Sequence, residues 1–210
     1  PASPMLSQWQ QNLGNNNFIY NHLQKIINNK SEYSRFSLIV FTPDEVNLTI
    51  LADATDKIAR FKDELNQTFP NLNFRTITTM AKTINRSRLT FADIRSNIPS
   101  KLIRPANTMV QKGAASENFS SDVSRLAQQQ GVSLNQINSG KTITHKSHQA
   151  KYFYLTISGS STSILNFLQK MITDFPALQI NKIALNPTNL VTYSDKNLSA
   201  RINLLFIFPI

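Results

Sequence analysis

The alternation of apolar and polar positions is clearest between residues 152 and 208, where it predicts a strand, a helix and two more strands. The strands at 152–159 and 178–185 are rich in β-branched and aromatic residues, and an apolar helical stripe runs from 163 to 172 until Phe175-Pro176 ends it. A last strand, 199–208, places alternate apolar residues on one face: Ala200, Ile202, Leu204, Phe206 and Phe208. Its second face turns apolar at Leu205 and Ile207, so we expect another element of the chain or a partner subunit to cover it.

The same pattern occurs earlier in the chain. Phe69-Pro70 precedes Phe175-Pro176 by 106 positions, and the helical stripe Ile58, Phe61, Leu65 falls on Ile164, Phe167, Met171. Residues 32–42 and 46–52 predict a hairpin, 55–69 a helix, and 72–78 and 88–94 two further strands. Such a repeat indicates two copies of one unit. We therefore predict an α+β protein of two ferredoxin-like domains, each helix-strand-strand-helix-strand-strand, with antiparallel sheets covered by helices on one face.

Four segments follow from this pattern: a leading helical segment (1–30), a first domain (31–96), a linker (97–119) and a second domain (120–210). Apolar spacing in 4–29 predicts a helix in two pieces, because Gly14-Asn-Asn-Asn17 is a poor helix interior. This helix is either an ordinary domain helix or the tail of a coiled coil. In the second domain, a short helix ends at Gly131, 134–139 reads as a weak strand, and 140–150 reads as a basic, polar loop.

The net charge of +10 raises the possibility of an anionic partner. The densest basic patch has one acidic neighbour, Asp93, and comprises Lys82, Arg86, Arg88, Arg95, Lys101 and Arg104. The remaining cations are scattered, which favours a role in solubility over nucleic-acid binding. No cysteine is present, so the sequence excludes disulfides and thiolate zinc sites. The apolar run 204–210 is too short for a membrane helix, and a chain that begins with Pro1 suggests a fragment or trimmed form.

Few residues offer catalytic chemistry. His145 and His148 lie three apart without a nearby carboxylate, and a catalytic zinc needs three protein ligands. Gly159-Ser-Ser-Thr162 precedes a helix but lacks the P-loop spacing, and Asp53-Ala-Thr-Asp56 in the first copy would repel phosphate. Both stretches read better as helix caps, with Asp53 or Thr55 capping the first-copy helix. We expect no enzyme activity, no cofactor, no metal and no small-molecule substrate.

A strand ending in Ser158-Gly159, the helix Ile164-Leu-Asn-Phe-Leu-x-x-Met171, Phe175-Pro176, Leu178-x-Ile-x-x-Ile-x-Leu185 and a final apolar strand together resemble the periplasmic domain of the PilO family. The lead-in Gln129-Gln-Gly-Val-Ser-Leu134 shares the likeness, and the first copy is similar to the PilN family. These families belong to the assembly platform of type IV pili, with equivalents in type II secretion. Their members pair one such domain with a membrane helix, whereas this chain has two domains and no membrane helix, which suggests a trimmed two-domain relative or two joined domains.

The resemblance implies a non-enzymatic scaffold in the periplasm, held at the bacterial inner membrane in its full-length form. Such a protein acts by dimerising with itself and with PilN-, PilO- or PilP-like partners. The expected contacts are Leu205, Ile207 and Phe208 on the last strand and Leu6, Trp9 and Leu13 on the leading helix. Two other readings remain open: a basic module for nucleic acid or anionic lipid that uses 82–104 and 141–151, and a sensor with a small-molecule pocket between its domains.

Overall fold

The computed structural model describes residues 4–29, 31, 34–84, 86–106, 118–144, 148–188 and 197–209. In chain order its elements are α1 (Pro4–Asn28), β1 (Arg35–Phe41), β2 (Glu45–Ala52), α2 (Thr55–Thr68), β3 (Arg75–Ile84), β4 (Ser87–Asn97), the short 3-10 helix η1 (Ser100–Leu102), α3 (Phe119–Gln129), β5 (Ser133–Thr144), β6 (His148–Gly159), α4 (Ser161–Asp174), β7 (Leu178–Pro187) and β8 (Leu198–Pro209). The predicted order of helix, two strands, helix, two strands is therefore present twice.

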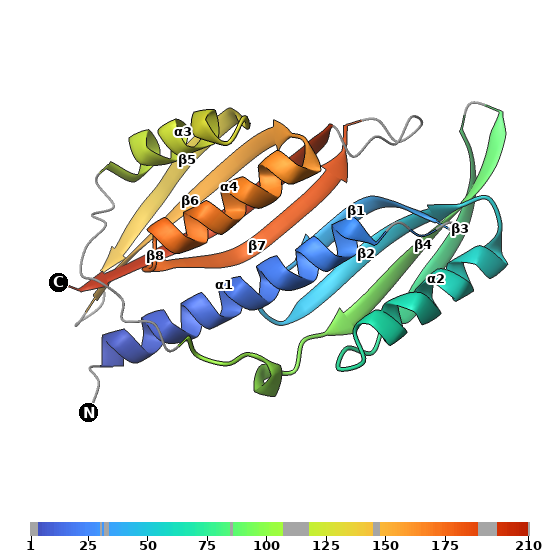
Figure 1. The fold of residues 1–210 in the computed structure, drawn as a ribbon, viewed down its shortest axis with the longest axis horizontal. Helices are drawn as coiled ribbons and strands as arrows, with labels where there is room; N and C mark the ends of the chain where they lie inside the picture. Colours follow the sequence, from blue (N-terminus) through green and yellow to red (C-terminus); the bar gives the residue numbers. More distant parts are fainter. Residues whose placement is uncertain are drawn as a thin grey trace.

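All eight strands form one antiparallel sheet in the order β3-β4-β2-β1-β7-β8-β6-β5 (Figure 1). Each half contributes four strands in the same relative order, since β7-β8-β6-β5 repeats β3-β4-β2-β1. The halves join where β1 pairs with β7, through Ile39 with Leu185, Val40 with Ala184 and Phe41 with Ile183. The prediction of two separate sheets is therefore corrected to one, because the edge strand of each half satisfies the backbone groups of the other.

The helices cover one face of this sheet, and the core lies between the two layers (Figure 1). On α3, the Phe119 ring lies 4.6 Å from the rings of Phe153 and Phe206 and 5.0 Å from Phe175, which ends α4. In the other half, the ring centroids of Phe36 on β1 and Phe61 on α2 lie 5.3 Å apart. The helical stripe predicted for α2 is confirmed as buried, at Ile58, Phe61, Leu65 and Phe69. The alternate positions predicted for β8 are also buried, at Ala200, Ile202, Leu204 and Phe206. The side chain of Phe208 lies outside the described residues.

Helix α1 is continuous, so the predicted break at residues 14–17 is wrong. Its buried residues follow helical spacing straight through the asparagine run: Trp9, Asn12, Asn16, Ile19, Leu23 and Ile26. Gly14 is required by a close contact, since a Cβ there would overlap the carbonyl oxygen of Arg104. The Ala106 amide donates to the Gln10 carbonyl at 2.9 Å and ties the same return segment to the helix. Tertiary contacts thus override the low helix propensity of this stretch.

Two further local predictions need correction. Helix α2 has Ala54 at its N-cap and no side-chain cap, because Asp53 binds the Lys57 ammonium at 2.8 Å instead. Residues 140–144 continue strand β5, and 148–150 begin β6, where a loop was predicted. The cap predicted in residues 159–162 is confirmed, since the Ser163 amide donates to the Ser160 hydroxyl oxygen at 3.0 Å. A phosphate bound at residues 159–162 would need free amides in the first turn of α4. The Ser160 hydroxyl already accepts from one of these amides.

Replacing Gly14 by alanine tests the contact between α1 and the return segment. In an isolated helix this change stabilises by about 1 kcal/mol. Here the added methyl group must displace the Arg104 backbone, so we expect the free energy of unfolding to fall by about 1–3 kcal/mol in urea titrations. Asn17→Ala, an exposed change on the same helix, is the control and is expected to be neutral or slightly stabilising. A Gly14→Ala protein more stable than the wild type would refute the close approach.

Candidate interaction surfaces

Of the three residues predicted to contact a partner on the last strand, Leu205 and Ile207 lie on the face of the sheet that no described helix covers. Leu205 and Ile207 are half-buried, whereas the alternate residues Leu204 and Phe206 face the core. Across the strand pair, Leu205 lies opposite Tyr152, and Ile207 lies opposite Ala150. Ile143 on β5, 44% exposed, lies opposite Ala150 in turn. We call Ile143, Ala150, Tyr152, Leu205 and Ile207 the open-face patch.

The residues predicted to contact a partner on the leading helix have contacts within the chain. Trp9 is 8% exposed, and its indole Nε1 donates to the Ile207 carbonyl at 3.0 Å. Leu13 is partly buried and packs against the core cluster. The side chain of Leu6, like that of Phe208, lies outside the described residues. The part of α1 that is described therefore serves as an internal contact of the fold, and a role for it in partner binding stays a prediction.

Asn16, which lies in the predicted helix break and was not predicted to have a role, makes the most specific contact of α1. Its side chain is fully buried, its Nδ2 donates to the Leu178 carbonyl at 2.8 Å, and its Oδ1 accepts from the Ile180 amide at 2.8 Å. These two groups lie on one edge of β7, in a stretch that β1 does not reach, since β1 pairs only with residues 183–185. The amide of Asn16 thus makes the two hydrogen bonds that a neighbouring strand would otherwise supply. The sequence feature that could have indicated this contact is an asparagine at the centre of an apolar helical stripe.

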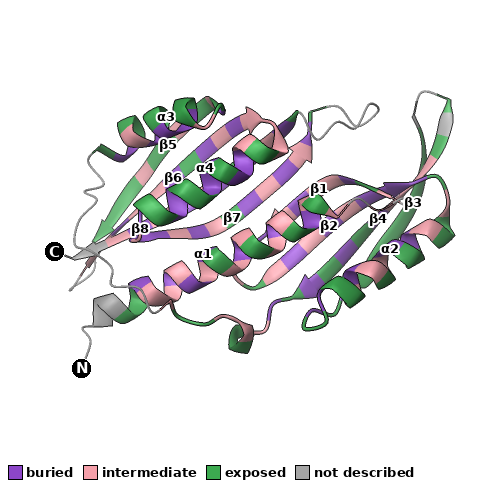
Figure 2. Ribbon diagram, in the orientation of Figure 1, coloured by how far each residue is buried: buried purple, intermediate pink, exposed green. Residues whose placement is uncertain are grey.

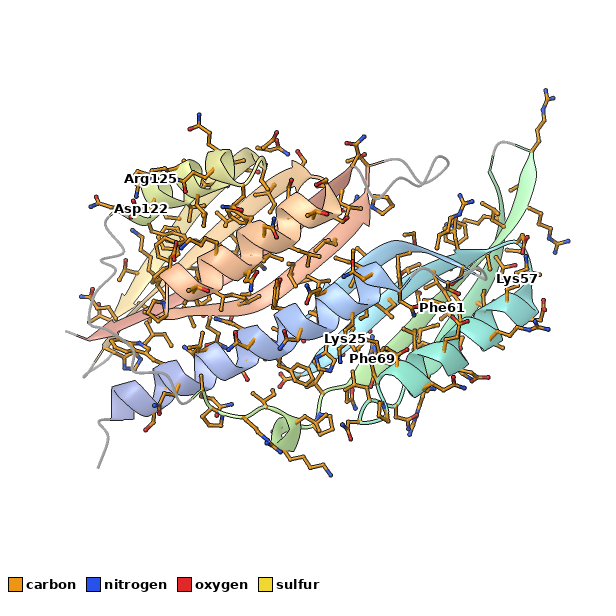
Figure 3. All side chains as sticks on the ribbon, in the orientation of Figure 1. Lys25, Lys57, Phe61, Phe69, Asp122 and Arg125 are labelled. Atoms are coloured by element: carbon orange, nitrogen blue, oxygen red, sulfur yellow. The ribbon has the colours of Figure 1, made fainter. Side chains whose placement is uncertain are left out.

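The aromatic contact between α1 and the end of α2 includes a histidine. The His22 ring stacks on Phe18 at 3.9 Å and on Phe69 at 5.3 Å, and its Nδ1 lies 2.8 Å from the Phe18 carbonyl. Burial lowers the pKa of His22 below its ordinary value, and the nearby Lys25 acts in the same direction. Figure 3 shows Lys25 and Phe69 on neighbouring elements at this point. The folded environment therefore favours the neutral form of His22, although the hydrogen bond to the Phe18 carbonyl opposes this effect.

The predicted basic patch is divided by the fold. Lys82, Arg86 and Arg88 lie in the β3–β4 hairpin where it extends beyond β2, whose pairing with β4 ends at Thr90. Arg95 lies about 23 Å further along β4 from Arg88. It donates to the Asn47 side chain at 2.7 Å and lies 3.8 Å from the Glu45 carboxylate. Lys101 and Arg104 follow in and after η1. The six side chains do not form one contiguous surface.

Two features of the described residues bear on the binding of a small ligand or a metal. An apolar pocket between the halves has room for about one water molecule (10 Å³) and is lined by Ile27, Phe36, Ile39, Ser161, Leu185, Asn186, Pro187 and Leu198. Within the described ranges, no group of three His, Cys, Asp or Glu residues gathers as a metal site; His145 lies outside them. No helix in the described part of the chain is long and apolar enough to cross a membrane.

The chain shows a likeness to a solved structure but to no family model or curated protein. No protein-family model matches the sequence, and a search of curated proteins finds no relative. Among solved structures, the chain is similar to the type 4 fimbrial biogenesis protein PilO from Pseudomonas aeruginosa, with 11% identity and a TM-score of 0.40. The alignment covers 45% of this chain and 69% of that chain.

Two buried asparagines one turn apart on α1 provide a matched test of the Asn16 contact. Asn16→Leu leaves the Leu178 carbonyl and the Ile180 amide without partners, so we expect a loss of about 2–4 kcal/mol in the free energy of unfolding. Asn12 is equally buried, but its Nδ2 has no acceptor among the described residues. Asn12→Leu is therefore expected to be neutral or stabilising. Equal losses for both variants in urea titrations would contradict the role given to Asn16.

The lowered pKa of His22 predicts a pH-dependent stability. The unfolded chain takes up a proton near the ordinary histidine pKa of about 6.5, whereas the folded chain does so only at lower pH. The free energy of unfolding should therefore be constant above that pH and should fall as the pH decreases below it. His22→Phe keeps the aromatic contacts and removes the titration, so urea titrations at pH 7.5 and 5.0 should differ less for this variant. An unchanged pH dependence would assign the effect to other groups.

Proposed function

We propose that this protein is a non-enzymatic scaffold of the inner-membrane assembly platform of a type IV pilus or a type II secretion machine, acting in the periplasm. The observation that carries the proposal is the PilO-like order of motifs from Tyr152 to Phe208. Each of its parts lies in an element of the expected kind: strand β6, helix α4 ending at Phe175, and strands β7 and β8. The matching helix stripe also lies on the core side of α4, at Ile164, Phe167, Leu168 and Met171.

The proposal extends to the architecture of each half. The shared strand order supports the interpretation that both halves are ferredoxin-like units derived from one ancestor. The first half is then the PilN-like member and the second half the PilO-like member. This arrangement would place in one chain two units that the resemblance assigns to the same platform.

The open-face patch is the proposed contact with a partner. Antiparallel sheets commonly leave one face to water, and such a face is then polar. Here Tyr152, Leu205 and Ile207 present apolar surface instead, and their neighbours Ile143 and Tyr154 are each 44% exposed. A second copy of the chain or another platform protein would bury this surface and gain the corresponding hydrophobic free energy. No chemical step is required of such a protein.

The alternative basic-module function has less support. It requires the cations between Lys82 and Arg104 to act together, and the fold separates them along β4. Salt distinguishes the two functions, because binding to phosphate weakens steeply as salt rises, whereas apolar association persists.

A double substitution tests the open-face patch. We expect the wild-type protein to approach twice the monomer mass in light scattering as its concentration rises, at both low and high salt. Leu205→Glu/Ile207→Glu places two charges in the patch and should return the protein to a monomer, because an unpaired buried carboxylate is strongly unfavourable. Thr156→Glu, on the same face of β6 outside the patch, is the control and should leave the mass unchanged.

A wild-type protein that stays monomeric under all conditions would remove self-association from the proposal. The assembly role has its own test in the organism that encodes the chain. Deletion of its gene should abolish surface pili or secretion, and the wild-type gene should restore them where the Leu205→Glu/Ile207→Glu gene does not. Normal pili and secretion in the deletion strain would refute the role.

A further inference from the structure

Strand β3 forms one edge of the sheet and is open along its length. It pairs with β4 on one side, and no strand among the described residues pairs with its other side. Every described side chain from Arg75 to Thr83 is exposed, so the strand appears green along these residues in Figure 2. Among its described side chains, the large apolar ones are Ile77 and Met80, which are 55% and 45% exposed. A long open edge of this kind presents free backbone donors and acceptors to another extended chain.

The opposite edge of the sheet, strand β5, is less suited to pair with an added strand. Strand β5 has two register shifts against β6, between Leu134 and Gln136 and between Ser139 and Thr142, and helix α3 lies against it. Bulges of this kind twist an edge away from pairing and protect it. Strand β3 has a single register shift near its start, between Thr76 and Thr78, and pairs regularly with β4 from there to Ile84. Of the two edges, β3 is the one suited to accept a strand.

The chain itself shows how this strand position is used. In the repeated strand order, β7 holds in the second half the place that β3 holds in the first. Strand β7 accepts an antiparallel strand, β1, on the edge that corresponds to the open edge of β3. The corresponding edge is thus paired with a strand in the second half, at β7, and is unpaired in the first half, at β3.

The positive charge of the β3–β4 hairpin indicates which kind of strand would bind to the open edge of β3. The β3–β4 hairpin carries Arg75, Lys82, Arg86 and Arg88, whereas its one acidic residue, Asp93, already accepts hydrogen bonds from Thr49 at 2.7 Å and Thr78 at 3.0 Å. A second copy of β3 would bring like charges together, and β5 of a second copy has bulges and Lys141. An acidic strand satisfies both the free backbone groups and the cations.

We propose that β3 is a docking site for an extended, acidic segment of a partner protein, which adds to the sheet as an antiparallel ninth strand. Backbone hydrogen bonds along β3 supply the affinity, and carboxylates opposite Arg75 and Lys82 supply the selectivity. Ile77 and Met80 then contact apolar side chains of the added strand. This site lies on a different strand from the open-face patch and does not depend on a role in pilus assembly.

Amide exchange measures strand addition directly. The probe is a synthetic twelve-residue peptide of alternating glutamate with valine or threonine, blocked at both ends. In the isotope-labelled full chain, the outward amides of β3 should exchange rapidly when free, and at least about tenfold more slowly with saturating peptide. The amides of β5 should not change. A peptide with the same acidic residues but with proline in place of every second valine should give no protection, since proline cannot form the ladder.

Charge reversal tests selectivity. Arg75→Glu/Lys82→Glu should weaken binding of the acidic peptide by about tenfold or more at low salt. Lys182→Glu/Arg201→Glu, which reverses two exposed cations on the second half of the sheet, should leave it unchanged. Circular dichroism and urea titration establish that each variant is folded. Three results would overturn the proposal: binding without protection of β3 amides, concentration-dependent protection without peptide, which identifies a second copy as the occupant, or tighter binding of a single-stranded oligonucleotide than of the peptide.

Discussion

The contact between Asn16 and the edge of β7 is the interaction on which the rest of the fold depends. The two halves of the sheet share only three residue pairs between β1 and β7, and the edge of β7 beyond them faces α1. There Asn16 satisfies the Leu178 carbonyl and the Ile180 amide, and Trp9 satisfies the Ile207 carbonyl of β8. A buried backbone group without a partner costs about 1–3 kcal/mol. Helix α1 therefore closes an opening that would otherwise expose the joint to water.

This joint makes one core out of two repeats. Helix α1 precedes the first half in sequence, yet it packs against β7 and α4 of the second half as well. The resulting cluster of buried side chains extends from Ile50 and Phe61 in the first half to Phe167 and Leu204 in the second. A short paired joint between two independent cores would act as a hinge, whereas a helix packed across it opposes bending. We therefore regard the halves as one folding unit.

The sequence was sufficient for those elements in which one face is buried and the other exposed. The stripe of α2 and the alternation of β8 are set by burial alone, so periodicity identifies both the element and its core side. Periodicity failed where a tertiary contact sets the residue type. Gly14 and Asn16 are poor helix formers, and their reasons are the Arg104 carbonyl and the edge of β7, both more than eighty residues away.

Edge strands were the second failure, and again the cause is physical. Residues 140–144 of β5 are exposed except for the half-buried Gly140, so no alternation marks them as a strand. Hydrophobic alternation likewise identifies one of the two candidate surfaces and misses the other. The apolar second face of β8 was readable because it departs from the expected alternation. The openness of β3 was not readable, because an edge is defined by the absence of a neighbour, which only the sheet order reveals.

The uncovered face of the sheet distinguishes the two halves. In the first half this face has apolar residues at Leu51, Phe91 and Met80, toward the β3–β4 turn. Beyond them it carries a polar network, with Asp93 accepting from Thr49 and Thr78 and with Arg95 donating to Asn47. A network of this kind is stable in water and needs no partner. The second half carries Tyr152, Leu205 and Ile207 at its end of the same face, where water is a poor solvent for them. On this face the first half thus has a paired polar network, and the second half has the open-face patch.

The two halves give the proposed scaffold two contacts of different physical character. The open-face patch is apolar and belongs to the second half, whereas the β3 edge is basic, rich in free backbone groups and belongs to the first. Because β1–β7 pairing and α1 join the halves, the position of one surface fixes the position of the other. Two partners bound at these sites would be held at a set distance and orientation. A scaffold needs this property, and two domains connected only by a linker would lack it.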